Sequence, residues 1–297
     1  MKKSFLIYLI LLSLLLAGCS DTAAPAQIAA TTLPVYEFTA RICENTPLSV
    51  TRLVTEEVSC LHDYTLNVNQ VKAAENAEHI IISGAGLEEF LDDILLNARI
   101  VDASQGIVLI TPEEHHHHHD HEEESGHEGH HHEEDPHIWL SPANAMTMAD
   151  NICIRLTEQY PEYAHTFAGN LNHLQEDLTE LQQYGDDMLA DLSCRELITF
   201  HDGFSYLAEA FDLTILDAIE EESGSEASAK ELIHMIEEVE HHNLPAIFTE
   251  KSGSVSAAGI IARETGAKEY ALDMAMAGDS YFDAMYHNIN TLKEALQ

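Results

Sequence analysis

Positively charged residues are scarce in this chain of 297 residues. Lys and Arg number 13 against 52 Asp and Glu, which gives a formal net charge of −39. Because such a chain would repel a phosphate backbone, the composition excludes nucleic-acid binding. Hydrophobic residues still make up 45% of the sequence, which is enough for a substantial core in one large domain or two ordinary ones.

Several motifs of catalysis and redox chemistry are also absent. The five cysteines never form Cys-x-x-Cys, so zinc-ribbon and thioredoxin-like sites have no support. The metalloprotease motif His-Glu-x-x-His does not occur, and neither does the nucleotide-binding motif Gly-x-x-x-x-Gly-Lys. If the function of this protein needs ATP hydrolysis, the ATPase must therefore be another chain. We expect no enzyme, although a metal-dependent hydrolase is the main rival class, since three histidines with an open position can activate water.

The N-terminus has the features of an exported lipoprotein. Residues 1–18 form a basic start and an apolar stretch, which predict a signal peptide too short for a permanent membrane span. The sequence Leu16-Ala17-Gly18-Cys19 resembles a lipobox, which predicts lipidation of Cys19 and a tether over residues 20–27. We therefore expect a lipid anchor on the extracytoplasmic face of the cell membrane; a plain cleaved signal peptide is the alternative.

The four remaining cysteines permit two disulfides in an exported chain. The preferred pairings, which join neighbouring elements, are Cys43–Cys60 and Cys153–Cys194. Free buried thiols are the alternative.

From residue 27 onward, β-type runs alternate with helix-type runs. The expected strands are Ile28–Thr31, Ser49–Val54, His79–Ser83, Arg99–Asp102, Glu196–Phe200, Leu213–Ala218, Ala246–Thr249 and Glu269–Leu272. The expected helices include Asn67–Ala77, Glu88–Asn97, Ala229–His241, Val255–Thr265, Asp279–Leu296 and one that Ser141 caps and Pro142 starts. This alternation predicts an α/β fold with two similar lobes, residues 28–160 and 193–297, each with a mostly parallel sheet flanked by helices.

A long helix is expected between the lobes. Apolar residues recur at three- and four-residue intervals through residues 161–192, and the glycines at 169 and 185 weaken the pattern without ending it. A single rigid helix of this length would run the height of the molecule and limit hinge motion between the lobes.

A histidine-rich insertion interrupts the first lobe at residues 113–135. Such a composition cannot offset its ordering entropy, so we expect disorder. Its ten histidines could capture zinc weakly, or the segment could be a tolerated low-complexity loop. They are His115, His116, His117, His118, His119, His121, His127, His130, His131 and His132.

Three other histidines lie at strand ends or in the loops beside them: His62, His137 and His201. Since ligands gather at the carboxyl ends of strands in α/β sheets, two facing lobes would bring these side chains to one cleft. Neutral imidazoles with a nearby carboxylate form a normal zinc site. The adjoining carboxylates, Asp63, Asp135 and Asp202, could orient the imidazoles or serve as caps.

The segments around these histidines resemble the metal-receptor lipoproteins of bacterial ABC importers, the zinc/manganese solute-binding family called cluster A-I. The matching segments are His62-Asp63-Tyr64-Thr65-Leu66, Asp135-Pro136-His137-Ile138-Trp139-Leu140-Ser141-Pro142, Phe200-His201-Asp202-Gly203-Phe204-Ser205-Tyr206-Leu207, Ile247-Phe248-Thr249-Glu250, and Ala271-Leu272-Asp273 with residues 281–288. The resemblance covers about residues 27–297.

The resemblance implies a metal held in the cleft between the lobes. Its ligands would be His62 and His137 from the first lobe with His201 and Asp273 from the second. Three imidazoles and one carboxylate favour Zn²⁺ over Mn²⁺, which prefers oxygen ligands. Many relatives have proline after the aspartate where this chain has Met274, so water or another carboxylate stays open as the fourth ligand.

The resemblance also implies a function. The protein would capture Zn²⁺ outside the cell and deliver it to an ABC permease and its ATPase subunit, acting as a monomer. Glu250 would support a ligand or be structural, and Trp139 would anchor the core. A manganese receptor of the same family is the alternative, with a surface adhesin or zinc buffer as a third reading.

Overall fold

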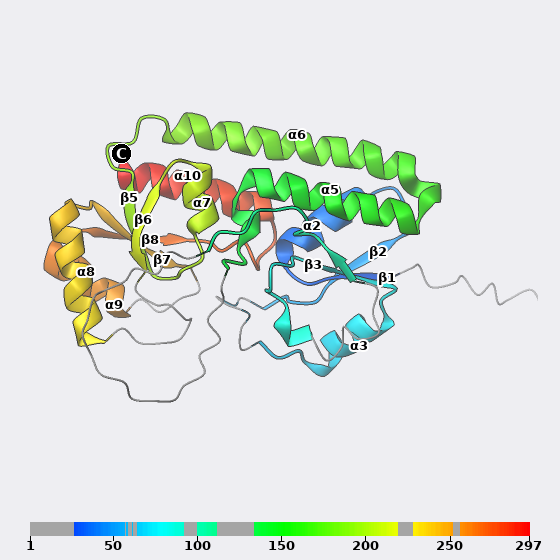
Figure 1. Cartoon of the computed structure of the whole chain (residues 1–297), viewed down its shortest axis with the longest axis horizontal. Helices are drawn as coiled ribbons and strands as arrows, with labels where there is room; N and C mark the ends of the chain where they lie inside the picture. Colours follow the sequence, from blue (N-terminus) through cyan, green and yellow to red (C-terminus); the bar gives the residue numbers. More distant parts are fainter. Residues whose placement is uncertain are drawn as a thin grey trace, which may run out of the picture.

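The computed structural model describes residues 27–56, 58, 61, 64–91, 100–111, 134–218, 228–251 and 256–297. Two four-stranded parallel sheets form two lobes, which lie side by side beneath one long helix (Figure 1). This arrangement confirms the predicted α/β fold with a helix that joins two similar lobes. Among the described helices, none has the length and apolar character needed to cross a bilayer.

The first lobe contains the sheet β2-β1-β3-β4. Its strands are β1 (Gln27–Ala30), β2 (Ser49–Arg52), β3 (His79–Ile82) and β4 (Ile100–Asp102). The helices of this lobe are α2 (Leu33–Ile42), α3 (Val68–Asn76), α5 (Pro142–Gln159) and the short 3₁₀ turns η1 (Glu89–Leu91), η2 (Ile138–Leu140) and η3 (Pro161–Tyr163). As predicted, Ser141 caps α5 by accepting a hydrogen bond from the Asn144 amide, with Pro142 at the first turn.

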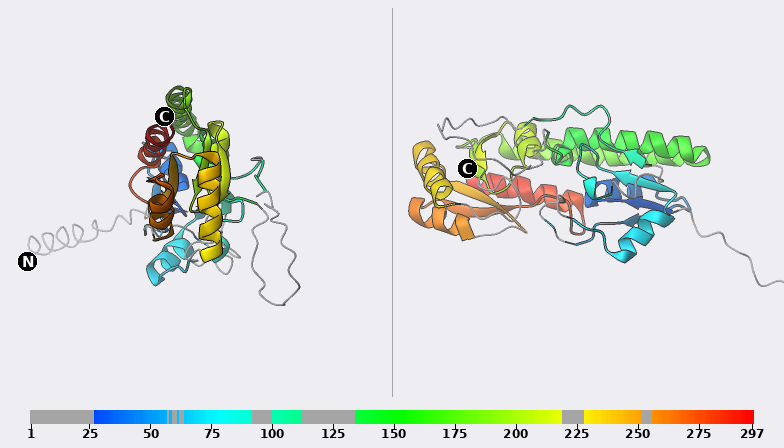
Figure 2. Two further views of the ribbon diagram at one scale, coloured as in Figure 1. Left: turned by 90° about the vertical axis from the view of Figure 1, so that its left-hand side faces the viewer. Right: turned by 60° about the horizontal axis from the view of Figure 1, so that its bottom comes forward.

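The second lobe repeats the pattern with the sheet β6-β5-β7-β8. Its strands are β5 (Glu196–Thr199), β6 (Thr214–Ala218), β7 (Ala246–Glu250) and β8 (Lys268–Leu272). Its helices are α7 (Ser205–Ala210), α8 (Ala229–His242), α9 (Ser256–Thr265) and α10 (Tyr281–Leu296). Helices α8 and α9 lie at the far end of this lobe (Figure 2), away from the first lobe.

The joining helix α6 (Ala164–Leu189) has 26 residues. It spans about 39 Å at 1.5 Å per residue. It packs on α5 and α2 of the first lobe and on α10 of the second (Figure 1). The helix is therefore part of the packed core of both lobes and not an exposed linker between them. Gly185 lets α6 approach the second lobe, because a Cβ there would come within 2.1 Å of the Phe211 ring.

The predicted disulfide between Cys153 and Cys194 is wrong. Both are free thiols: Cys153 is buried on α5, whereas Cys194 precedes β5 and its Sγ lies 3.3 Å from the Glu196 carbonyl. Cys43 is also a free, buried thiol, and Cys60, its predicted partner, lies outside the described residues. Burial, with the neighbouring Cys153 thiol, raises the pKa of Cys43 to about 12. The alternative of buried free thiols therefore holds for Cys43 and Cys153, whereas Cys194 is a free thiol of intermediate exposure.

A buried carboxyl group, that of Glu88, accepts hydrogen bonds from both loops that follow β1 and β3, and so holds these loops together. Its Oε1 accepts hydrogen bonds from the Thr31 hydroxyl and the Ser83 amide, both at 2.7 Å. Its Oε2 accepts one from the Gly84 amide at 3.0 Å. Burial raises the pKa of Glu88 to about 7 in spite of these donors, and the charge of nearby Asp102 adds to the shift.

The raised pKa predicts a pH-dependent stability. Between the ordinary pKa of 4.5 and about 7, folded Glu88 holds a proton that the unfolded chain releases. The stabilisation is therefore complete below pH 4.5 and lost as the pH rises through 7. Relative to Glu88→Gln, the wild type should lose on the order of 3 kcal/mol of unfolding free energy between pH 4 and pH 8, measured by urea denaturation. Exposed Glu89→Gln is the control, and parallel pH profiles for wild type and Glu88→Gln would contradict the prediction.

Candidate metal centre between the lobes

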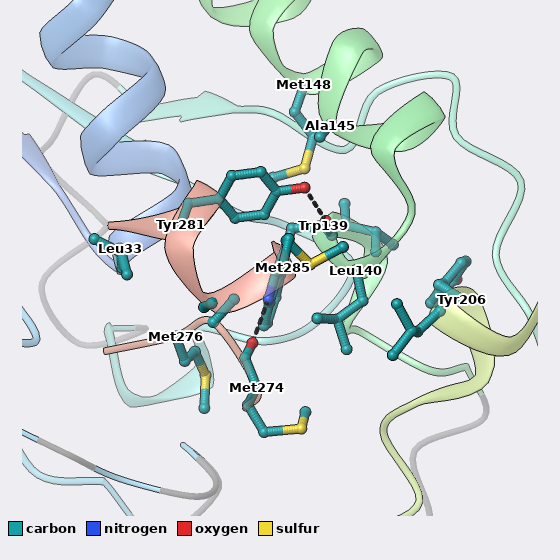
Figure 3. Packing of buried hydrophobic residues seen from close by; sticks show 14 of the residues in the cluster. Leu33, Trp139, Leu140, Ala145, Met148, Tyr206, Met274, Met276, Tyr281 and Met285 are labelled. Atoms are coloured by element: carbon teal, nitrogen blue, oxygen red, sulfur yellow. Dashed lines mark hydrogen bonds between the residues drawn. The ribbon is translucent and has the colours of Figure 1, made fainter. Parts of the chain in front are cut away.

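The two lobes meet around one tryptophan. Trp139, in η2, is fully buried and its indole Nε1 donates a hydrogen bond to the Met274 carbonyl of the second lobe at 2.8 Å. The Tyr281 hydroxyl, at the start of α10, donates one back to the Trp139 carbonyl at 2.8 Å. Figure 3 shows both bonds within a cluster of methionine and leucine side chains. Trp139 is thus the predicted core anchor, and it also fixes one lobe against the other.

A second contact positions the segment that precedes this tryptophan. The Tyr206 hydroxyl, from α7, donates to the Asp135 carbonyl at 3.1 Å and accepts from the Ile110 amide at 2.9 Å. Burial raises the pKa of Tyr206 to about 12, so its hydroxyl stays protonated and can donate at neutral pH. The second lobe therefore holds the loop that carries Asp135.

The loop after β8 is fixed to the first lobe in the same way. The Leu33 amide, at the start of α2, donates to the Met276 carbonyl at 3.1 Å, and the Arg52 guanidinium donates to the Gly278 carbonyl at 2.7 Å. Each lobe thus supports the loop of the other, which limits how far the loops can move apart.

His137 lies in this seam with one ring nitrogen occupied. Its Nδ1 is 2.8 Å from Asp135 Oδ1, and its backbone amide donates to the same oxygen at 2.9 Å. Both residues are buried. The Nε2 atom of His137 is buried without a hydrogen-bond partner among the described residues. A carboxylate at Nδ1 with a bare Nε2 is the usual arrangement of a metal-binding imidazole.

His201 faces His137 from the second lobe. It follows β5 directly and is buried, and its backbone carbonyl accepts a hydrogen bond from the Thr199 hydroxyl at 2.9 Å. Its Nδ1 is 3.5 Å from Oε1 of Glu250, the last residue of β7. Gly203 leaves room for the ring, because a Cβ there would come within 2.8 Å of His201 Nε2.

The two imidazoles meet across the lobes. Their ring centroids are 5.2 Å apart and the ring planes are inclined by 83°. Each ring has a carboxylate at Nδ1, which is Asp135 for one and Glu250 for the other. This donor set suits a borderline metal such as zinc, and the bare Nε2 of His137 fits a ligand role.

Asp273 follows β8, and its carboxylate contacts a backbone amide and Lys251. Its Oδ1 accepts the Ala275 amide at 2.8 Å, and its Oδ2 is 3.2 Å from Lys251 Nζ. Asn288 holds its backbone through two hydrogen bonds of 2.7 Å. The structure therefore brings His137 and His201 together but does not add Asp273 to them.

Several predicted site residues cannot be placed. His62, Cys19 and the ten histidines of the insertion lie outside the described residues. Within the described part of the chain, no three His, Cys, Asp or Glu side chains form a ready metal site. Lys251 is the residue that sequence reasoning missed; its signal is a cation directly after Glu250 in a chain with few cations.

Comparison with known proteins identifies the family of this chain. Residues 28–295 match the profile of the ZnuA family, described as "Zinc-uptake complex component A periplasmic". A protein of Treponema pallidum (strain Nichols), provisionally named as metal-binding, is 30% identical over 242 residues, which cover 79% of this chain and 76% of the relative. The zinc-binding lipoprotein AdcA of Streptococcus pneumoniae (strain ATCC BAA-255 / R6) is 29% identical over 309 residues. This match covers 99% of the chain but 61% of AdcA, so the chain spans less than two thirds of that relative.

Solved structures share the architecture. A crystal structure of ZnuA, 28% identical, superposes with a TM-score of 0.78 and covers 92% of this chain and 100% of that chain. The profile match covers nearly all of the described fold, including the seam with His137 and His201. The chain therefore belongs to the ZnuA family and is a metal-binding solute receptor rather than an enzyme.

Proposed function

We propose that this receptor captures Zn²⁺ outside the cytoplasm and delivers it to a membrane permease driven by a separate ATPase. The observation that carries the proposal is the pair of buried imidazoles, one from each lobe, with centroids 5.2 Å apart. His62 and Asp273 complete the proposed ligand set. Imidazole donors favour zinc over manganese, and zinc is the ion named for the AdcA relative and present in its Zn(II)-bound structure.

The proposed location follows from the N-terminus and the relatives. Lipidation of Cys19 would anchor the receptor on the extracytoplasmic face of the membrane, with residues 20–26 as the tether, because Gln27 already belongs to β1. The AdcA relative is named a lipoprotein and the family description is periplasmic, so an extracytoplasmic site is common to both.

The buried imidazoles predict the effect of removing them. His137→Ala and His201→Ala should each weaken Zn²⁺ binding by at least two orders of magnitude, because each removes one donor of a tetrahedral site. Isothermal titration calorimetry with a competing chelator measures the loss. His173→Ala is the control, since that exposed histidine pairs with Glu176 on the surface of α6. Tight binding by both cleft variants would refute the proposed site.

The carboxylate behind His137 predicts a smaller effect. Asp135→Asn should lower Zn²⁺ affinity roughly 10- to 100-fold, because the imidazole loses the acceptor that sets its tautomer and orientation. The same titration measures it, and circular dichroism confirms that the variant folds. An unchanged affinity would mean that Asp135 stabilises only the conformation of the loop, through its hydrogen bond with the His137 amide.

The histidine-rich insertion is proposed to hold additional zinc weakly near the cleft. Deletion of residues 113–134 should leave the tight site intact, while the weak sites seen in calorimetry disappear and growth on scarce zinc slows. If neither the weak binding nor the growth changed, the capture role would be wrong.

A further inference from the structure

An ion pair lies at the edge of the proposed site. Lys251 Nζ is 3.2 Å from Asp273 Oδ2. The two residues leave neighbouring parallel strands at the same level, because β7 and β8 pair with Glu250 opposite Leu272. The Lys251 amide also donates to the Leu272 carbonyl at 2.8 Å. The register of the sheet therefore places this ammonium group beside this carboxylate.

The two oxygens of the Asp273 carboxylate have different partners. Oδ1 of Asp273 accepts the Ala275 amide, and Asn288, itself fully buried, holds the backbone on both sides. Oδ2 is the oxygen that faces Lys251. A metal that bound Asp273 through this oxygen would compete with the ammonium group for it.

The two partners differ in their exposure to solvent. The Lys251 side chain is 60% exposed, whereas that of Asp273 is 17% exposed. The cation can therefore swing into water while the carboxylate stays in place. Glu250, the residue before Lys251, lies beside His201. Two consecutive residues thus contact two proposed ligands: Glu250 contacts the His201 imidazole, and Lys251 contacts the Asp273 carboxylate.

We propose that Lys251 competes with the metal for Asp273 and thereby sets the metal selectivity of the receptor. This inference rests on the proposed function. The ammonium group penalises every metal ion that recruits the carboxylate, both by holding Oδ2 and by like-charge repulsion. The penalty falls more heavily on Mn²⁺, which depends on oxygen donors, than on Zn²⁺, which imidazoles bind well.

The test is Lys251→Met, which removes the charge and keeps a flexible apolar stem. Affinities for Zn²⁺ and Mn²⁺ are measured by competition with a fluorescent chelator at low salt. We expect Zn²⁺ to bind roughly threefold more tightly and Mn²⁺ roughly tenfold, so that the preference for zinc narrows. High salt should reduce the difference between variant and wild type, because it already screens the ammonium group.

Two matched variants isolate the cause. Arg155→Met removes the same charge from an exposed pair with Glu158 on α5, so it corrects for the change in net charge. The second is a comparison within the Asp273→Asn variant. If the gain acts through that carboxylate, adding Lys251→Met to Asp273→Asn should not tighten the binding of either metal relative to Asp273→Asn alone.

The outcomes separate the two proposals. An unchanged Zn²⁺/Mn²⁺ preference in Lys251→Met, relative to Arg155→Met, overturns the competition while leaving the zinc receptor intact. Weaker binding of both metals would show that Lys251 orients Asp273 instead, and this too overturns it. If the wild type binds no zinc tightly, the proposed function fails and the inference fails with it.

Discussion

The hydrogen bond from the Trp139 indole to the Met274 carbonyl is the contact on which the site depends. It is buried between the lobes, so breaking it would leave a polar donor without water or protein as a partner. Trp139 lies two residues after His137, and Met274 directly follows Asp273. One bond therefore fixes the distance between segments that carry proposed ligands from different lobes.

Helix α6 also holds the two lobes together, at a place away from the Trp139 hydrogen bond. It packs against helices of both lobes, and the absence of a side chain at Gly185 lets it contact the Phe211 ring closely. A hinge would have to separate these contacts as well as the buried seam. The two imidazoles are thus held close together by contacts in the seam and along α6, so the proposed binding of a metal would spend little binding energy on closing the lobes.

Local patterns predicted most of the fold. The eight strands lie within two residues of their expected bounds, because apolar runs between turn residues mark buried parallel strands well. Helices α2 and α7 are not among the segments that the sequence predicts, and Gly185 looks like a weak point although it makes a required contact. The predicted Cys153–Cys194 pairing is wrong because elements that follow one another in the sequence need not bring two thiols into contact: Cys153 lies on α5, whereas Cys194 lies in the segment before β5.

Some residues of the candidate site could be predicted from the sequence, and others could not. His137 and His201 could be identified because each follows or precedes a recognisable element, but the pairing of Lys251 with Asp273 depends on the register of two strands about twenty residues apart. With 52 acidic residues and 13 basic ones, the surface already attracts cations of every kind. General attraction cannot discriminate between metals. Discrimination has to come from the donor atoms, and there an ammonium group that withholds an oxygen does more for selectivity than another carboxylate would.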